Sequence, residues 1–243
     1  MRSRAGRRPM LTAVVLSIVA TAVGIFLALQ IDWFPTQATT KAHEIDTLYD
    51  VLLIVSVPIF VLVMAVVIFS VTQFKAKPGD LGDGAPIHGN TKLEIIWVTI
   101  PFLIVSALSI YGWVVLNSIE AKAGNTMVVN VKGQQFAWSF SYPSEGKVKS
   151  NTLMLPKDRP IEFRINTDDV LHDFWVPAFR VKSDAVPGLT TKIRATPNKL
   201  GTYAVVCAEL CGLGHSTMRS RVQVMPAEKF NAWIASKQKG AAK

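Results

Sequence analysis

Residues 95–116 read IIWVTIPFLIVSALSIYGWVVL, 22 consecutive positions without a charged side chain. A helix needs about 20 apolar residues to cross the hydrocarbon core of a bilayer. Two similar uncharged runs precede this one, at residues 11–31 and 51–74. Pro58 and Pro101 interrupt two of the runs, which membrane helices tolerate when neighbouring groups satisfy the freed carbonyls. The first half of the chain is therefore predicted to be embedded in a membrane.

The first run has two readings. The basic leader MRSRAGRRPM followed by an apolar body fits a secretory signal peptide. The run is long for a signal peptide, however, and no small-x-small cleavage site follows it. We therefore expect residues 1–31 to form a basic leader and an additional transmembrane helix. A helical hairpin should follow, with helices at 47–74 and 93–117 joined by an inner loop at 75–92.

The basic residues of the short loops predict the orientation of the helices. Four arginines precede the first run, and Lys75, Lys77 and Lys92 lie between the second and third runs. The intervening loop has Lys41 as its only Lys or Arg. Loops rich in Lys and Arg stay on the cytoplasmic side. The chain is thus predicted to be a multi-pass protein of a bacterial plasma membrane, with everything after residue 120 on the outer face.

The outer half has the pattern of an all-β domain. Short runs rich in β-branched and aromatic residues alternate with Pro and Gly breaks. Seven or eight strands in about 100 residues suggest a sandwich or small barrel at 120–226. A closing helix begins at residue 227, with Phe230, Trp233 and Ile234 on one face, and a basic tail runs to 243. The expected strands are 127–131, 136–142, 152–155, 161–166, 192–195, 202–206 and 220–224.

The outer half is also strongly basic. From residue 120 onward there are 18 Lys and Arg against 10 Asp and Glu, within a chain of net charge +9. Nucleic-acid binding is a poor explanation for a membrane-anchored domain on the outer face. Contact with anionic lipid headgroups or with an acidic partner surface explains the charge better.

The stretch CAELCGLGHSTM, residues 207–218, holds both cysteines of the chain. An oxidising compartment favours a disulfide, but a bridge between Cys207 and Cys211 would close a very small loop. Zinc would accept both cysteines with His215 and with His172 of DVLHDFWVP. Met218 instead favours copper, because thioether is a soft ligand that structural zinc rarely uses. Two thiolates and two imidazoles can hold a pair of metal ions.

This stretch resembles the C-x-E-x-C-x-x-x-H-x-x-M motif of subunit II of the bacterial aa3-like haem–copper cytochrome c oxidases. Three other segments resemble the same family: LEIIWVTIPFLIV at 93–105, GQQFAWSFSYP at 133–143 and DVLHDFWVPAFRVKSDAVPG at 169–188. The resemblance therefore covers most of the chain. It implies a cupredoxin-like β-domain that follows a helical hairpin.

The resemblance further implies a dinuclear copper A centre. Cys207 and Cys211 would be bridging thiolates, and His172 and His215 would each supply one imidazole. Met218 would be the weak axial ligand of one copper.

Glu209 would give its backbone carbonyl to the other copper, with its carboxylate turned towards a magnesium ion shared with subunit I. The implied function is to accept electrons from a cytochrome c donor and pass them to haem in subunit I. Oxygen is reduced there and protons are translocated, so no catalytic residue is expected in this chain. No C-x-x-C-H motif occurs, so no covalently attached haem is expected.

Other functions remain open at this point. A copper A nitric-oxide reductase would have an equivalent subunit, and a membrane-anchored copper-binding or assembly protein would use similar ligands. A disulfide-linked β-domain that only scaffolds a complex would bind no metal. A quinol oxidase subunit fits less well, because that branch lacks the copper ligands.

Three residues outside the copper motif are candidates for transfer roles. Glu94, followed by Trp97, reads physically as an acid at a helix N-terminus. The resemblance instead places it at the entrance of a proton pathway into subunit I. Phe136 stands where the family commonly has the tryptophan that receives electrons, and Trp138 matches a second tryptophan nearer the copper. Because the outer half is basic, we expect a donor that is membrane-tethered or held in a supercomplex.

Overall fold

The computed structural model describes residues 4–75, 78–79, 82 and 86–241. The predictions that concern Arg2, Lys77 and the last two residues of the tail lie outside this part of the chain. The chain divides into two compact units. One comprises residues 1–32 and 47–113, and the other comprises residues 33–46 and 114–243.

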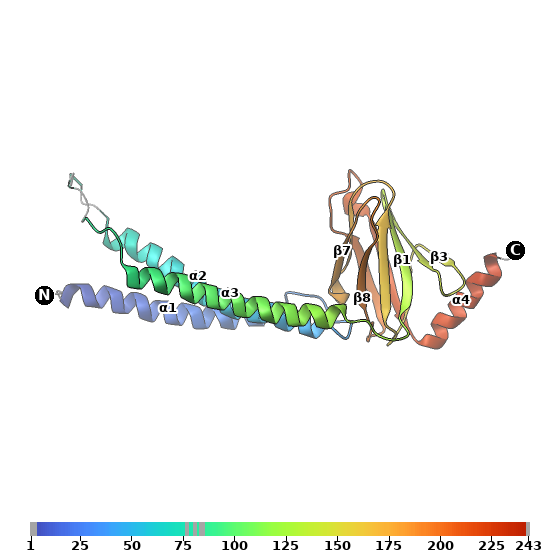
Figure 1. Ribbon diagram of the computed structural model, residues 1–243, viewed down its shortest axis with the longest axis horizontal. Helices are drawn as coiled ribbons and strands as arrows, with labels where there is room; N and C mark the ends of the chain where they lie inside the picture. The colour runs from blue at the N-terminus through green and yellow to red at the C-terminus, as the bar shows by residue number, and fades with distance from the viewer. Residues whose placement is uncertain (1–3, 76–77, 80–81, 83–85, 242–243) are drawn as a thin grey trace. The chain divides into compact units, whose positions relative to one another are not determined.

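Three long helices correspond to the three apolar runs. They are α1 (Arg4–Gln30), α2 (Ala42–Gln73) and α3 (Thr91–Glu120) (Figure 1). Pro58 lies inside α2 and Pro101 inside α3. All three are long and apolar enough to cross a membrane. Most of their Leu, Ile, Val and Phe side chains are exposed, as expected where lipid replaces water as the solvent. α2 and α3 extend a few residues beyond the predicted spans.

The outer half forms two five-stranded sheets, as a sandwich requires. The strand orders are β3-β2-β1-β5-β8 and β4-β10-β9-β6-β7. Figure 1 labels β1, β3, β7 and β8. The strands are β1 (Met127–Gln134), β2 (Ala137–Tyr142), β3 (Val148–Ser150), β4 (Leu153–Pro156), β5 (Ile161–Thr167), β6 (His172–Val176), β7 (Val181–Ala185), β8 (Thr191–Ala195), β9 (Gly201–Cys207) and β10 (Arg219–Met225).

Ten strands exceed the predicted seven or eight because β3 and β7 were not recognised, and the segment of β6, DVLHDFWVP, was read only as a plausible strand end. β3 has three residues, and β7 reads VKSDA with two charged positions. β6 is buried at four of its five positions and therefore lacks the alternation of apolar and polar residues that marks a half-buried strand. These strands are fixed by their partners, β2, β6 and β9, rather than by local pattern.

The core lies between the two sheets. Along β1 the side chains alternate, with Val129 and Val131 buried and Lys132 directed outward. Phe174 of β6 packs against Trp138 and Phe163 of the opposite sheet, with ring centroids 5.6 and 5.5 Å apart. These aromatic contacts join the two sheets across the core.

The predicted closing helix is present as α4 (Ala227–Ala241) (Figure 1). Phe230 and Ile234 are buried, and Trp233 is partly buried against the core. The ring of Tyr142 packs edge-on against Phe230 and Trp233. The amphipathic pattern read from the sequence therefore identified the face of α4 that contacts the β-domain.

Candidate metal centre

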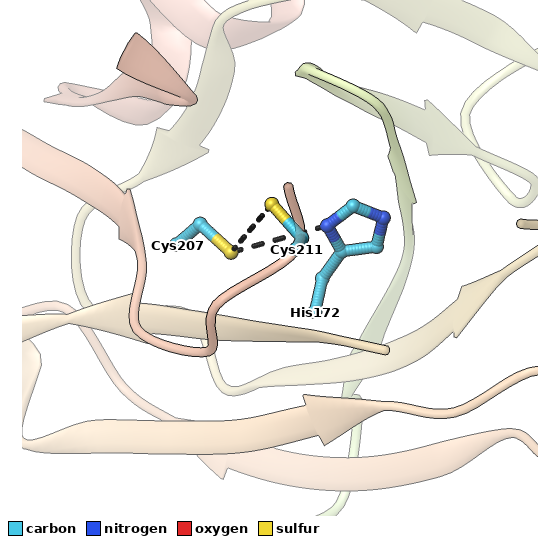
Figure 2. Close-up of side chains that lie close together, drawn as sticks. All are labelled: His172, Cys207 and Cys211. Atoms are coloured by element: carbon cyan, nitrogen blue, oxygen red, sulfur yellow. Dashed lines mark hydrogen bonds between the residues drawn. The ribbon is translucent and has the colours of Figure 1, made fainter. Parts of the chain in front are cut away.

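The copper motif begins where β9 ends. Cys207 is the last residue of β9, and the backbone then turns through Cys211 into the short 3-10 helix η2 (His215–Thr217). The register between β6 and β9 pairs Phe174 with Cys207, which brings the start of β6 beside the end of β9. His172 is the first residue of β6 and therefore lies beside both cysteines (Figure 2).

The donor atoms form one continuous set of contacts. His172 Nδ1 lies 3.9 Å from Cys207 Sγ, and Cys207 Sγ lies 3.9 Å from Cys211 Sγ (Figure 2). Cys211 Sγ in turn lies 3.7 Å from His215 Nδ1 and 3.8 Å from Met218 Sδ. The structure thus brings together all five side chains that the sequence predicted as copper ligands.

Glu209 contributes to this cluster through its backbone. The Cys207 thiol donates to the Glu209 carbonyl over 3.3 Å, whereas the Glu209 side chain is exposed. The Glu209 carbonyl oxygen therefore lies beside the cysteine cluster, and its role as a ligand stays a prediction.

The distances between donors fit shared metal ions. Two metal–sulfur bonds of about 2.3 Å that meet at about 115–120° reproduce the distance between the sulfur atoms of Cys207 and Cys211. One such bond and a metal–nitrogen bond of about 2.1 Å reproduce the two sulfur–imidazole separations at bond angles of about 114–125°. The donors are soft sulfur atoms and imidazoles, a set that suits copper. The residues present therefore fit the implied copper pair.

A disulfide is not formed in this structure. Both cysteines are free, and their sulfur atoms are about twice as far apart as the ~2.05 Å of a disulfide bond. Both thiols are buried. Burial, together with the neighbouring Cys207, raises the pKa of the Cys211 thiol to about 11. Metal binding at neutral pH would therefore have to displace a thiol proton.

Asp169 orients His172 from the side opposite Cys207. Its carboxylate accepts a hydrogen bond from His172 Nε2 at 2.8 Å, which leaves Nδ1 directed at the sulfur atoms. The same carboxylate accepts the backbone N–H groups of Gln135 and Val170 and the Thr167 hydroxyl. Burial alone would raise the pKa of Asp169, but these hydrogen bonds hold it well below its usual range.

Asp173, the neighbour of His172, is in the opposite electrostatic situation. It is buried, and burial together with its cross-strand partner Asp184 raises its pKa to about 6. Its backbone carbonyl accepts the N–H of Ala208 at 3.1 Å. The first residue after β9 is thereby tied to β6, which fixes the position of Cys207 relative to His172.

The β1–β2 turn supports the cysteine loop. The Gln135 side chain donates to the Cys211 carbonyl at 2.6 Å, while its backbone N–H donates to Asp169. Phe136 packs directly on the loop, because a Cβ atom added to Gly214 would lie 2.4 Å from its ring. One short turn therefore contacts both the cysteine loop and the residue that orients His172.

Trp138 and Phe136 occupy different positions. Trp138 is buried, and its ring stands edge-on to His172 with centroids 6.1 Å apart. Phe136 remains 38% exposed at the surface. The structure therefore places one aromatic ring beside a candidate ligand and the other at the surface of the cysteine loop.

Glu94 lies in the other unit and is not part of this cluster. It is in the first turn of α3, where its carboxylate accepts the Asn90 backbone N–H at 3.1 Å. Asn90 Oδ1 in turn accepts the N–H groups of Lys92 and Leu93. These bonds agree with the physical reading of Glu94 as an acid at a helix N-terminus.

Sequence reasoning missed Asp169 and Gln135 as parts of the site. A signal for Asp169 existed, since a metal-bound histidine commonly donates its second ring N–H to a carboxylate. Asp168 and Asp169 both precede His172 closely, however, and the sequence does not distinguish them. Nothing in the sequence pointed to Gln135, which contacts a loop 76 residues away.

Comparison with known proteins agrees with this geometry. Residues 12–115 match the transmembrane domain of cytochrome c oxidase subunit II, and residues 148–225 match its periplasmic domain. Cytochrome c oxidase subunit 2 of Thermostichus vulcanus is 32% identical over 91% of this chain and 83% of its own length. The Synechocystis protein of the same name is 28% identical over 91% of this chain and 81% of its own length.

A solved structure gives a further likeness. The periplasmic domain of subunit II of cytochrome oxidase from Bradyrhizobium japonicum is 29% identical, with a TM-score of 0.47, and covers 49% of this chain and 97% of its own length. Transmembrane and periplasmic matches occur in one chain, in the order that the fold shows. The chain belongs to the subunit II family of the haem–copper cytochrome c oxidases.

Proposed function

We propose that this chain accepts electrons from a cytochrome c donor at a dinuclear copper A centre. It then passes them to haem in subunit I, where oxygen is reduced to water and protons are translocated. The observation that carries the proposal is the buried set of donors, His172, Cys207, Cys211 and Met218, with half-buried His215 beside them. Its spacing fits a pair of soft metal ions.

Each ligand has a defined task. Cys207 and Cys211, as thiolates, would bridge the two ions, and His172 and His215 would bind one ion each through Nδ1. Met218 and the Glu209 carbonyl would complete the set. When bound, the copper pair would supply a redox centre in which one electron is shared between two nuclei.

The surroundings of the ligands are suited to fast electron transfer. Asp169 holds the His172 ring, Gln135 holds the Cys211 backbone, and buried Trp138 excludes water from one side. Ligands held in this way change position little when the charge of the centre changes, which keeps the reorganisation energy low. Low dielectric surroundings and hydrogen bonds to the ligating side chains also tune the potential of a metal site.

Transfer to and from the centre involves residues at its edge. Trp138 is proposed as the relay towards His172, and Phe136 as the surface residue that the donor approaches. The basic character of the outer half supports a donor that is membrane-tethered or held in a supercomplex. The chain would lie in a bacterial plasma membrane as a multi-pass protein, with its β-domain on the outer face.

Two carboxylates are proposed to act towards subunit I. Glu209 has an exposed side chain beside its ligand carbonyl, where it could bind a magnesium ion shared with subunit I. Glu94 is proposed as the entrance of a proton pathway. Its carboxylate is exposed and accepts a hydrogen bond from a backbone N–H, which leaves acceptor capacity for a second partner.

The decisive test is copper reconstitution of the full chain in detergent. We expect two copper ions per chain and an electron paramagnetic resonance spectrum in which one unpaired electron couples to two copper nuclei. Cys211→Ser should abolish this spectrum. Met218→Leu should alter the spectrum. Its matched control is Met154→Leu, which replaces a methionine on β4, away from the ligands.

The alternatives predict other results. One localised copper ion that a chelator removes readily would favour a copper-binding or assembly protein. No bound copper, with a disulfide between the cysteines, would favour a scaffold. A copper A nitric-oxide reductase would give the same spectrum, and only turnover of the assembled complex with oxygen or nitric oxide would distinguish it.

A further inference from the structure

A recess lies on the outward face of the β3-β2-β1-β5-β8 sheet. It has a volume of about 640 Å³. Four cationic side chains line it, Lys132, Lys149, Arg164 and Lys192, together with Ser, Thr and Asn side chains, and no acidic residue does. We call these four residues and the recess between them the basic hollow.

The strand register explains why the cations gather there. Lys149 of β3 pairs with Ser141 of β2, and Ser141 pairs with Asn130 of β1. Asn130 pairs with Arg164 of β5, which pairs with Lys192 of β8. The five residues therefore form one row across the whole sheet. Four strand spacings of about 4.8 Å make this row about 19 Å long.

Internal counter-charges neutralise only part of the basic hollow. Glu162 accepts from Arg164 Nε at 3.1 Å but also binds Arg194 at 2.7 Å, and Asp168 forms an ion pair with Lys132. Lys149 and Lys192 have no ion-pair partner among residues 8–75 and 86–239, whose side chains the structure describes. The two ends of the row thus remain uncompensated.

We propose that the basic hollow binds an acidic segment of a partner protein. An extended segment of about six residues matches the length of the row. The hydroxyl and amide groups between the cations can hydrogen-bond to its carboxylates and backbone. A broad layer of lipid headgroups fits a recess less well than a narrow polypeptide does. Charge complementarity of this kind chiefly sets partner choice and association rate.

The basic hollow and the candidate metal centre lie on opposite faces of the same sheet. Lys132 faces outward, whereas a Cβ atom on the next residue, Gly133, would lie 3.0 Å from the His172 ring in the core. The sheet therefore separates a partner held in the hollow from the ligand cluster, and binding requires no metal.

The test uses the full chain in detergent and fluorescein-labelled hexaglutamate as the probe. Fluorescence anisotropy gives the affinity at low ionic strength. The variant Lys149→Gln/Lys192→Gln should weaken binding about tenfold, because it removes two exposed ion pairs. Lys229→Gln/Lys237→Gln on α4 is the matched control, since it removes the same charge at exposed positions. The control should change the affinity less than about twofold.

Cross-linking locates the bound probe. A carbodiimide should join hexaglutamate to Lys132, Lys149 or Lys192 and leave Lys229 and Lys237 unmodified. Equal weakening in the two double variants, or cross-links spread over both lysine sets, would show unspecific attraction and overturn the proposal. So would a hollow variant that loses binding to phosphatidylglycerol vesicles but retains hexaglutamate binding, because lipid would then be the occupant.

Discussion

Gly133→Ala is the most informative single substitution near the metal centre. A Cβ atom at this position would lie 3.0 Å from His172 Cδ2 and 3.2 Å from Trp138 Cζ3. Both rings are almost fully buried, and the His172 ring is also held by Asp169 at 2.8 Å. Neither ring can move aside without losing a contact. The added methyl group should therefore push His172 away from the cysteine sulfur atoms.

The expected cost follows from this crowding. An additional methyl group in a packed site costs about 1–3 kcal/mol. Replacing Gly by Ala recovers about 0.4–1 kcal/mol from the unfolded chain. The net loss should be about 1–2 kcal/mol, or a decrease of about 5–10 °C in the melting temperature of the β-domain. Gly124→Ala is the matched control, because nothing lies within 4 Å of its added Cβ.

Two measurements on the full chain in detergent decide the outcome. Circular dichroism at the β-sheet minimum gives the melting temperature without metal, and a chelator competition gives the affinity for copper. Gly133→Ala should lower both, while Gly124→Ala should change neither appreciably. If Gly133→Ala melts and binds copper as Gly124→Ala does, then the position of His172 is not set by packing against Gly133, and the reasoning is refuted.

Two other substitutions test the electrostatics of the β-domain. Asp169→Asn should lower copper affinity about 10- to 100-fold, because it weakens the hydrogen bond that orients His172. Asp168→Asn, at an exposed neighbouring carboxylate, is the control. Equal copper affinities of the two variants would contradict the role of Asp169 in orienting His172. Glu162 tests pH dependence: its hydrogen bond with Arg194, opposed by burial, lowers its pKa below 4.5. Its ion pair therefore stabilises the fold above that pH and is lost as the pH falls through the lower folded value. Glu162→Gln should flatten the acid decrease in unfolding free energy, and an unchanged pH profile in denaturant titrations would count against this role.

Local sequence determined the membrane helices and four of the candidate metal ligands. A run of about 20 uncharged, apolar residues has few alternatives to a membrane helix. A bilayer core offers no hydrogen-bond partners, and a helix pairs its own backbone N–H and C=O groups. Four donors within residues 207–218 are close in space wherever that loop folds. The helix face with Phe230 and Ile234 was also predictable, since helical periodicity is a local property.

The tertiary structure decided how the ligands are completed and supported. His172 reaches the cysteines only through the pairing of β6 with β9, and β6 has no periodic signal of its own. Asp169 rather than Asp168 contacts His172, and Gln135 holds Cys211 across 76 residues. The basic hollow likewise exists only because five strands align their outward side chains in one row. Such features depend on pairing between distant segments, and that pairing is set by burial of the whole core rather than by any short stretch.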